Sequence, residues 1–134
     1  PLIYTENFEA SIPDPVENIM LIDHPGPLQK ACEELNRLYG EELTIYCSSP
    51  CFMEVLPKGV HKAGGLEVVL RRLGYEREQM AAFGDAVNDV EMLRLAGLGV
   101  CMGNGDAAAR AAADYVTASN DEDGVALALE KFVI

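Results

Sequence analysis

Two aspartates, Asp85 and Asp89, lie four residues apart in the stretch AAFGDAVNDVEML, residues 81–93. The residues before Asp85 are typical of an apolar strand, and those after it have helical spacing. Asp85 would be the last strand residue or the first loop residue, with Asp89 about one helical turn further on. Two hard oxygen ligands in an open site suit Mg²⁺, which takes few carboxylates, several waters and a substrate phosphate. The alternative is that Asp89 only caps the helix and interacts with its dipole.

Lys62 supports the interpretation as a metal and phosphate site. It follows the loop residues 59–61 and begins a predicted helix. A lysine beside carboxylates in such a cleft can neutralise a phosphate and hold an anionic nucleophile in place. The alternative is an ordinary surface lysine.

The elements that must position these residues alternate between helix and strand after Pro57. We expect strands at 80–83, 98–102 and 115–118, and helices at 62–73, 88–96, 107–113 and 125–132. Alternating elements with short links predict a parallel sheet covered by helices. Ligands of such sheets collect at the C-terminal ends of the strands. Gly84 is expected to allow a tight turn at one of these ends, directly before Asp85.

The first part of the chain has a different pattern. We expect a strand at 18–23, a helix at 28–39 with Gly40 as its C-cap, and a hairpin of strands 43–47 and 52–56. Prolines make residues 1–17 irregular or edge structure. The pattern switches at the linker 57–59, so the predicted domains are 1–57 and 58–134.

Composition excludes several classes of protein. Hydrophobic residues make up 49% of the 134 residues, which argues against disorder. The net charge is −12 and no basic cluster is present, so we expect no nucleic-acid partner. An acidic chain that binds anionic substrates needs local positive charge at the binding site, such as a metal ion or a lysine. No run is long and apolar enough to span a membrane, and no signal peptide is visible.

The cysteines are expected to be free. The chain has four, and Cys47 and Cys51 have a C-x3-C spacing with no second pair and no histidine nearby. A metal or redox pair is the less favoured interpretation of this spacing. Free thiols instead indicate a reduced, cytoplasmic location.

Three motifs follow one another in the second part of the chain. They are Gly-Asp-x-x-Asn-Asp at 84–89, Met-Gly-Asn-Gly at 102–105 and Ser-Asn-x-x-Asp-Gly at 119–124, after a helix that starts with Lys62-Ala63. From about Met53 to its end, the chain resembles the C-terminal core of the haloacid dehalogenase (HAD) superfamily, and more narrowly its Cof-type sugar-phosphate phosphatases. The resemblance implies an α/β fold: the C-terminal part of a HAD-like, Rossmann-like parallel-sheet core, preceded by the second half of an α/β (C2-type) cap.

The resemblance also implies roles for individual residues. Lys62 matches the lysine that steadies the nucleophile and the phosphate, and Asp85 matches the Mg²⁺ ligand. Asp89 matches the second acid, which supports the metal or its waters, and Asn88 matches a polar residue near the phosphate. Asn104 is a weaker match. The implied reaction is Mg²⁺-dependent hydrolysis of a small phosphorylated metabolite through an aspartyl-phosphate.

The nucleophile motif of that family, an apolar strand ending in Asp-x-Asp-Gly-Thr or Ser, is not found in the sequence. Residues 121–124 match its letters, but Val125 replaces the Thr and an acidic turn is the simpler interpretation. Asp23 ends an apolar strand, but no second aspartate follows two residues later. We therefore expect the C-terminal part of a longer enzyme, inactive by itself.

Two alternatives to the phosphatase interpretation stay open. In the first alternative, the chain is a non-catalytic module that binds a divalent ion or a partner. A truncated sheet would expose an edge strand through which the chain could self-associate. Residues 103–108 also match much of a dinucleotide fingerprint. Against that, Asp106 would put a negative charge where a pyrophosphate should lie.

Overall fold

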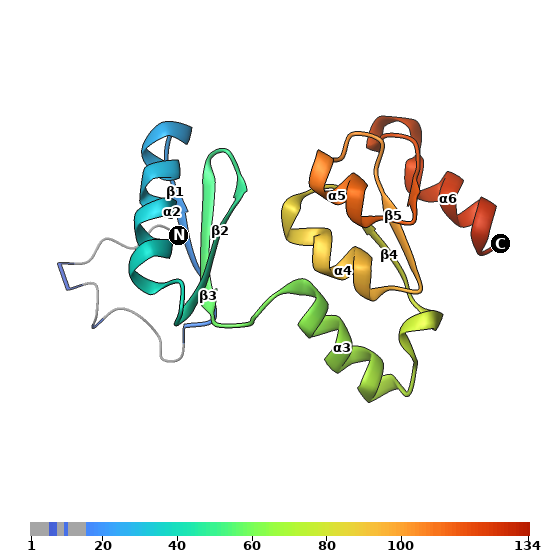
Figure 1. Cartoon of the computed structure of the whole chain (residues 1–134), viewed down its shortest axis with the longest axis horizontal. Coiled ribbons are helices and arrows are strands. Elements are labelled where there is room, and N and C mark those ends of the chain that lie inside the picture. The colour runs from blue at the N-terminus through green and yellow to red at the C-terminus, as the bar shows by residue number, and fades with distance from the viewer. Residues whose placement is uncertain (1–5, 8–9, 11–15) are drawn as a thin grey trace. The chain divides into compact units, whose positions relative to one another are not determined.

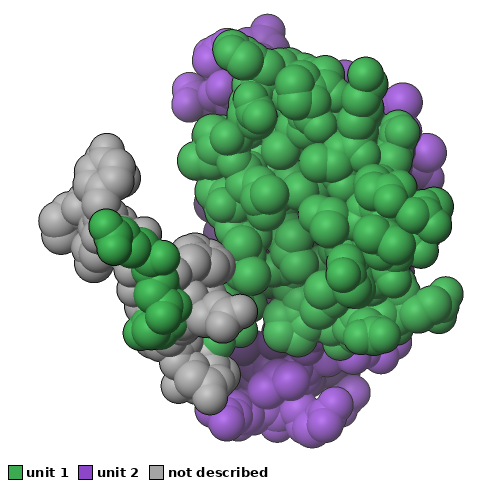
Figure 2. Space-filling model, turned by 90° about the vertical axis from the view of Figure 1, so that its left-hand side faces the viewer, with its two compact units in different colours: residues 1–58 green, residues 59–134 purple. Residues whose placement is uncertain are grey.

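The computed structural model describes residues 6, 7, 10 and 16–134, so the predicted irregular segment 1–17 lies mostly outside the described residues. The chain divides into two compact units, Pro1–Lys58 and Gly59–Ile134. Figure 1 shows their elements, and Figure 2 colours unit 1 green and unit 2 purple. The division falls at the linker that the sequence predicts. That the first unit is half of a cap and the second part of a catalytic core stays a prediction.

Unit 1 is a three-stranded antiparallel sheet with one helix on it. Its elements are β1 (Ile19–Ile22), α2 (Pro25–Tyr39), β2 (Leu43–Ser49) and β3 (Phe52–Pro57), and the strand order is β1-β3-β2. Leu28 and Cys32 of α2 pack against Ile45 of β2 and Met53 of β3. Alternate residues of a strand point to the same face of the sheet, and these two point to the face that the helix covers. The predicted β-α-β-β order and the hairpin are confirmed.

Helix α2 begins at Pro25, three residues before the predicted start. Pro25 lies in the first turn of the helix, where the fixed φ and the missing N–H of proline are well tolerated. The other end is as predicted, with Gly40 as the C-cap.

Unit 2 has a three-stranded parallel sheet in the order β4-β5-β6. Its elements are α3 (Lys62–Leu73), β4 (Ala81–Gly84), α4 (Val90–Leu95), β5 (Leu98–Cys101), α5 (Ala107–Ala112), β6 (Tyr115–Val116) and α6 (Gly124–Phe132), with short 3₁₀ turns η1 (Arg77–Gln79), η2 (Val87–Asp89) and η3 (Asn120–Glu122). The α/β class with a parallel sheet is thus confirmed. Strand β6 is shorter than predicted, and the helix expected at 88–96 is divided into η2 and α4.

The core of unit 2 lies where α4 and α5 pack on the sheet. Leu93, Val100, Cys101 and Ala109 are at most 1% exposed. These residues come from α4, β5 and α5. Because β5 is the central strand, the two helices pack against the middle of the sheet. Loops that follow β4, β5 and β6 are then held at one edge of the sheet, where the parallel strands end.

Candidate active site

Asp85 is the first residue after β4, and its side chain is exposed. Its backbone carbonyl accepts a hydrogen bond from the Asp106 N–H at 2.8 Å, so the backbone of Asp85 is tied to the loop after β5. Within the described part of the chain, its carboxylate has no hydrogen bond or ion pair. A fixed backbone with a free carboxylate leaves Asp85 able to bind a cation from solvent.

Asp89 differs from Asp85, because its side chain is 4% exposed and both of its oxygens have partners. Oδ2 accepts hydrogen bonds from the N–H groups of Asp85 (2.9 Å) and Ala86 (3.2 Å). Oδ1 forms an ion pair with Nζ of Lys62. No side-chain cap bond to α4 is made by Asp89. The carboxylate therefore fixes the turn after β4 and holds Lys62, rather than capping the helix that follows.

Gly84 makes room for the Asp89 side chain. A Cβ on Gly84 would lie 2.5 Å from the Asp89 Cβ and 2.9 Å from its Cγ, closer than real Cβ contacts come. Its φ is not in the left-handed region, unlike those of Gly59 and Gly74. A left-handed backbone conformation is therefore not what requires this glycine, and the predicted tight turn stays a prediction. Close packing of the carboxylate against the strand end requires it instead.

Lys62 is the first residue of α3, and its side chain is half exposed. The preceding residue, His61, caps the helix by accepting a hydrogen bond from the Gly64 N–H at 3.2 Å. Lys62 and Asp89 are 27 residues apart in the sequence, and the fold brings them into contact. One face of the ammonium thus pairs with Asp89, and the rest is open to solvent or to an anion.

The pKa of Asp89 lies below its ordinary value. Burial by itself would raise the pKa of this carboxyl, but the Lys62 ammonium and the two backbone N–H groups stabilise the charged form more. The carboxylate is therefore ionised at neutral pH, which the pairing with Lys62 needs.

The two asparagines have different surroundings. Oδ1 of Asn88 is buried and has no hydrogen-bond partner in the described residues. A buried acceptor of this kind is expected to find a partner, such as water or a ligand. Asn104 already has one, since its Oδ1 accepts from the Asn120 N–H at 2.9 Å. Asn104 therefore joins the loop after β5 to the turn after β6.

Two residues that hold the loop after β5 in place were missed as structural parts of the site. Arg110 donates to the carbonyl oxygens of Gly103 and Gly105, and Asp106 accepts from the Ala109 N–H at 2.7 Å as the N-cap of α5. An aspartate directly before the first residue of a predicted helix is a common N-cap. The sequence therefore contained a signal for this role of Asp106. Because Asp106 satisfies this N-terminus, the geometry gives the dinucleotide interpretation no support.

The donor set fits Mg²⁺ better than a metal bound by several protein ligands. No group of three or more His, Cys, Asp or Glu side chains gathers among the described residues. Mg²⁺ is commonly bound through one or two carboxylates, waters and a phosphate, and Asp85 with Asp89 nearby meets that need. All four cysteines are free, as predicted. None of the described helices is long and apolar enough to cross a membrane.

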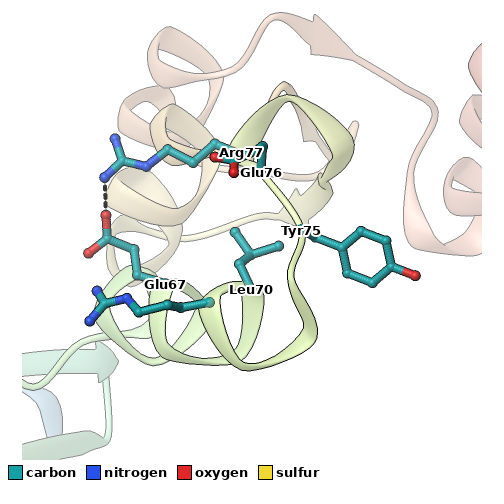
Figure 3. Close-up of a pocket in the computed structure, with 6 residues that line it drawn as sticks. Glu67, Leu70, Tyr75, Glu76 and Arg77 are labelled. Carbon is teal, nitrogen blue, oxygen red and sulfur yellow. Dashed lines mark hydrogen bonds and ion pairs between the residues drawn. The ribbon is translucent and has the colours of Figure 1, made fainter.

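The pocket in Figure 3 lies elsewhere, between α3 and the turn η1. Its lining includes Glu67 and Arg77, which form an ion pair, and Tyr75. None of the predicted site residues lines it. We assign it no part in the site.

Comparison with known proteins identifies the family. Residues 2–129 match the model of the haloacid dehalogenase-like hydrolases, and the chain belongs to this family. It is 44% identical over 102 residues to 5-amino-6-(5-phospho-D-ribitylamino)uracil phosphatase YcsE of Bacillus subtilis, covering 76% of this chain and 40% of that protein. The predicted HAD resemblance is confirmed.

Solved structures agree with this assignment. A haloacid dehalogenase-like hydrolase from Bacteroides thetaiotaomicron aligns with a TM-score of 0.80 and 41% identity, covering 95% of this chain and 48% of that one. The HAD subclass IIB sugar phosphatase BT4131 aligns with a TM-score of 0.74 and 34% identity, covering 87% of this chain and 43% of that one. The chain therefore spans less than half of the length of each of these three proteins.

Proposed function

We propose that this chain carries the metal-binding and phosphate-binding part of a Mg²⁺-dependent phosphomonoester hydrolase. One observation supports it above the others: Lys62 pairs with the buried Asp89, whose carboxylate also accepts the backbone N–H of Asp85, a residue with a free carboxylate of its own. A cation and an available carboxylate at the C-terminal end of a parallel strand suit a phosphate with its metal ion.

Each residue has its own part in this proposal. Asp85 would bind Mg²⁺ directly, because its carboxylate is free. Asp89 would support the metal through water, since both of its oxygens already have partners. Lys62 would hold the phosphate with the open side of its ammonium, and Asn88 would donate to it. When bound, Mg²⁺ would neutralise charge on the phosphate. Asn104 would keep the neighbouring loops in place.

We further propose a small phosphorylated metabolite as the substrate, a sugar phosphate or a similar compound. Two of the similar proteins, a 5-amino-6-(5-phospho-D-ribitylamino)uracil phosphatase and a sugar phosphatase, support this class by their names. The proposed cap is 1–57 and the proposed core 58–134. Four free cysteines support a cytoplasmic location.

The nucleophile would come from outside these 134 residues, because no Asp-x-Asp-Gly-Thr motif at a strand end is found among them. We therefore expect no Mg²⁺-dependent hydrolysis of p-nitrophenyl phosphate or of sugar phosphates by the purified chain. Turnover by the chain alone would contradict this part of the proposal.

Mg²⁺-dependent thermal stabilisation tests the metal site. We expect Mg²⁺ to raise the melting temperature of the wild-type chain, and Asp85→Asn to abolish that rise. Asp121→Asn is the matched control, since it removes one charge from the exposed acidic turn after β6. If both variants keep the rise, Mg²⁺ binds elsewhere and the proposal fails.

A partner-binding function has one observation in its favour. In the described part of the chain, β4 pairs only with β5, so its other edge is open. Self-association through this edge would appear as a concentration-dependent mass in analytical ultracentrifugation. A monomer at all concentrations would remove this alternative.

A further inference from the structure

An unusual residue caps α3, the helix that carries Lys62. Ser, Thr, Asp and Asn are the residues that usually cap helices, but here the N-cap is His61, in an extended conformation (φ −154°, ψ 165°). Its Nδ1 accepts the Gly64 N–H at 3.2 Å. An imidazole can accept at Nδ1 only while it is neutral and its proton is on Nε2.

This cap acts on the residue next to it. Lys62 is the first helical residue, so the bond from Gly64 to His61 closes the turn that sets the backbone of Lys62. From that position its ammonium reaches Asp89. Loss of the cap would free the first turn of α3 and, with it, the lysine.

We propose that His61 is a positioning residue, and that its neutral imidazole holds Lys62 against Asp89. Protonation would remove the acceptor and place a second cation beside Lys62 at a helix N-terminus, where positive charge is unfavourable. Histidine is the side chain that changes charge between about pH 5 and 8. Protonation of His61 would therefore loosen the Lys62–Asp89 pair while the Asp89 carboxylate is still ionised. The effect on the lysine does not depend on any catalytic activity, whereas an effect on turnover rests on the proposed function.

The charged groups that share a hollow with His61 pair with one another. The hollow between α3 and α4 is lined by His61 together with Glu67, Arg77, Glu91 and Arg94. Both glutamates already have arginine partners, Glu67 with Arg77 and Glu91 with Arg94. Both glutamates thus have a partner other than His61, and Lys62 is the cation next to His61 in the sequence.

NMR of the 134-residue chain without added metal tests the inference. We expect the side-chain carboxyl ¹³C resonance of Asp89 and the Gly64 amide resonance to move together with the His61 ring between about pH 8 and 5. His61→Asn supplies a good cap that does not titrate, and should remove both movements. The chain offers a matched control in His24, which is at the N-cap position of α2 but makes no side-chain cap bond. His24→Asn should leave both movements unchanged.

A variant without a cap gives the size of the effect. His61→Ala should raise the exchange rate of the Gly64 amide about fivefold relative to His61→Asn, the factor that corresponds to a typical N-cap. If this variant does not fold, the comparison of the wild type with His61→Asn still tests the inference.

Three results would overturn the inference. They are a proton on Nδ1 of His61 at neutral pH, an Asp89 resonance that does not move while His61 titrates, and a movement that persists in His61→Asn. Failure of the proposed function looks different. In that case Mg²⁺ causes no shift at Asp85, while the Asp89 and Gly64 resonances still move with the His61 ring in the absence of metal.

Discussion

Replacement of Asp89 by Asn keeps the shape of the side chain and removes its charge. In the variant, one carbonyl oxygen can still accept from the N–H groups of Asp85 and Ala86, but an NH₂ group would face Lys62 in place of Oδ1. Two hydrogen-bond donors, the NH₂ group and the Lys62 ammonium, would then face each other. The variant therefore loses the ion pair and weakens the two hydrogen bonds from charge-assisted to neutral ones.

The expected loss of stability follows from the exposure of each partner. Lys62 is half exposed, so solvent limits its pair with Asp89 to about 1 kcal/mol. The two backbone bonds together lose about 1–2 kcal/mol when their acceptor becomes neutral. Relief of the burial of a charge offsets part of this sum. We expect Asp89→Asn to lower the free energy of unfolding by about 2 kcal/mol near neutral pH.

The pH dependence has a definite sign. The pKa of Asp89 is lower in the folded chain than its ordinary value. The stability that this carboxylate contributes is therefore present above the ordinary Asp pKa of about 4 and is lost as the pH falls through the folded value. The difference between the wild type and Asp89→Asn should shrink toward zero in acid.

Urea unfolding followed by circular dichroism measures the difference at neutral pH and in acid. Glu34→Gln is the control, because it breaks an exposed pair with Arg37 and should leave stability unchanged within error. The reasoning would be refuted by an Asp89→Asn variant as stable as wild type at neutral pH. A difference that stays constant as the pH falls would refute it equally.

Three further results are expected. Gly84→Ala should lower the free energy of unfolding by about 1–3 kcal/mol in urea titrations, because the new Cβ would meet the Asp89 side chain at 2.5 Å. Asn104→Ala removes the bond to the Asn120 N–H and should increase hydrogen exchange at that amide, with little change at the amides of β4. In thiol labelling, the exposed Cys51 should react well before Cys32 and Cys101, since burial raises the pKa of both buried thiols.

Hydrophobic periodicity gives the order of the elements well. Helix α3 was predicted with its observed ends, 62–73, because an amphipathic pattern, a helix start after a loop and Gly74 all agree there. Boundaries near the site were less well predicted. The helix expected at 88–96 starts at Val90, because Asp89 binds back to the N–H groups before it and tightens that turn into η2.

Spacing predicts which site residues share a sheet edge but not what each one contacts. Asp85 and Asp89 look alike in the sequence, and only the fold shows that the first is free and the second fully paired. That difference depends on Lys62, which comes from another helix, and on the space beside Gly84. Long-range contacts of this kind leave no local signal. The cap by His61 was equally hidden, because histidine is not a usual N-cap.

Binding of Mn²⁺ in place of Mg²⁺, observed by NMR, tests most directly whether Asp85 is at the centre of a metal site. Mn²⁺ prefers the same oxygen ligands and broadens the resonances of nearby nuclei. We predict that low Mn²⁺ broadens the amides around 85–89 first, and that Asp85→Asn removes this effect while excess Mg²⁺ reverses it. A chain with a net charge of −12 can also attract cations without a specific site. Broadening that starts at the acidic turn 121–123, or that spreads evenly over the acidic surface, would contradict the proposed site.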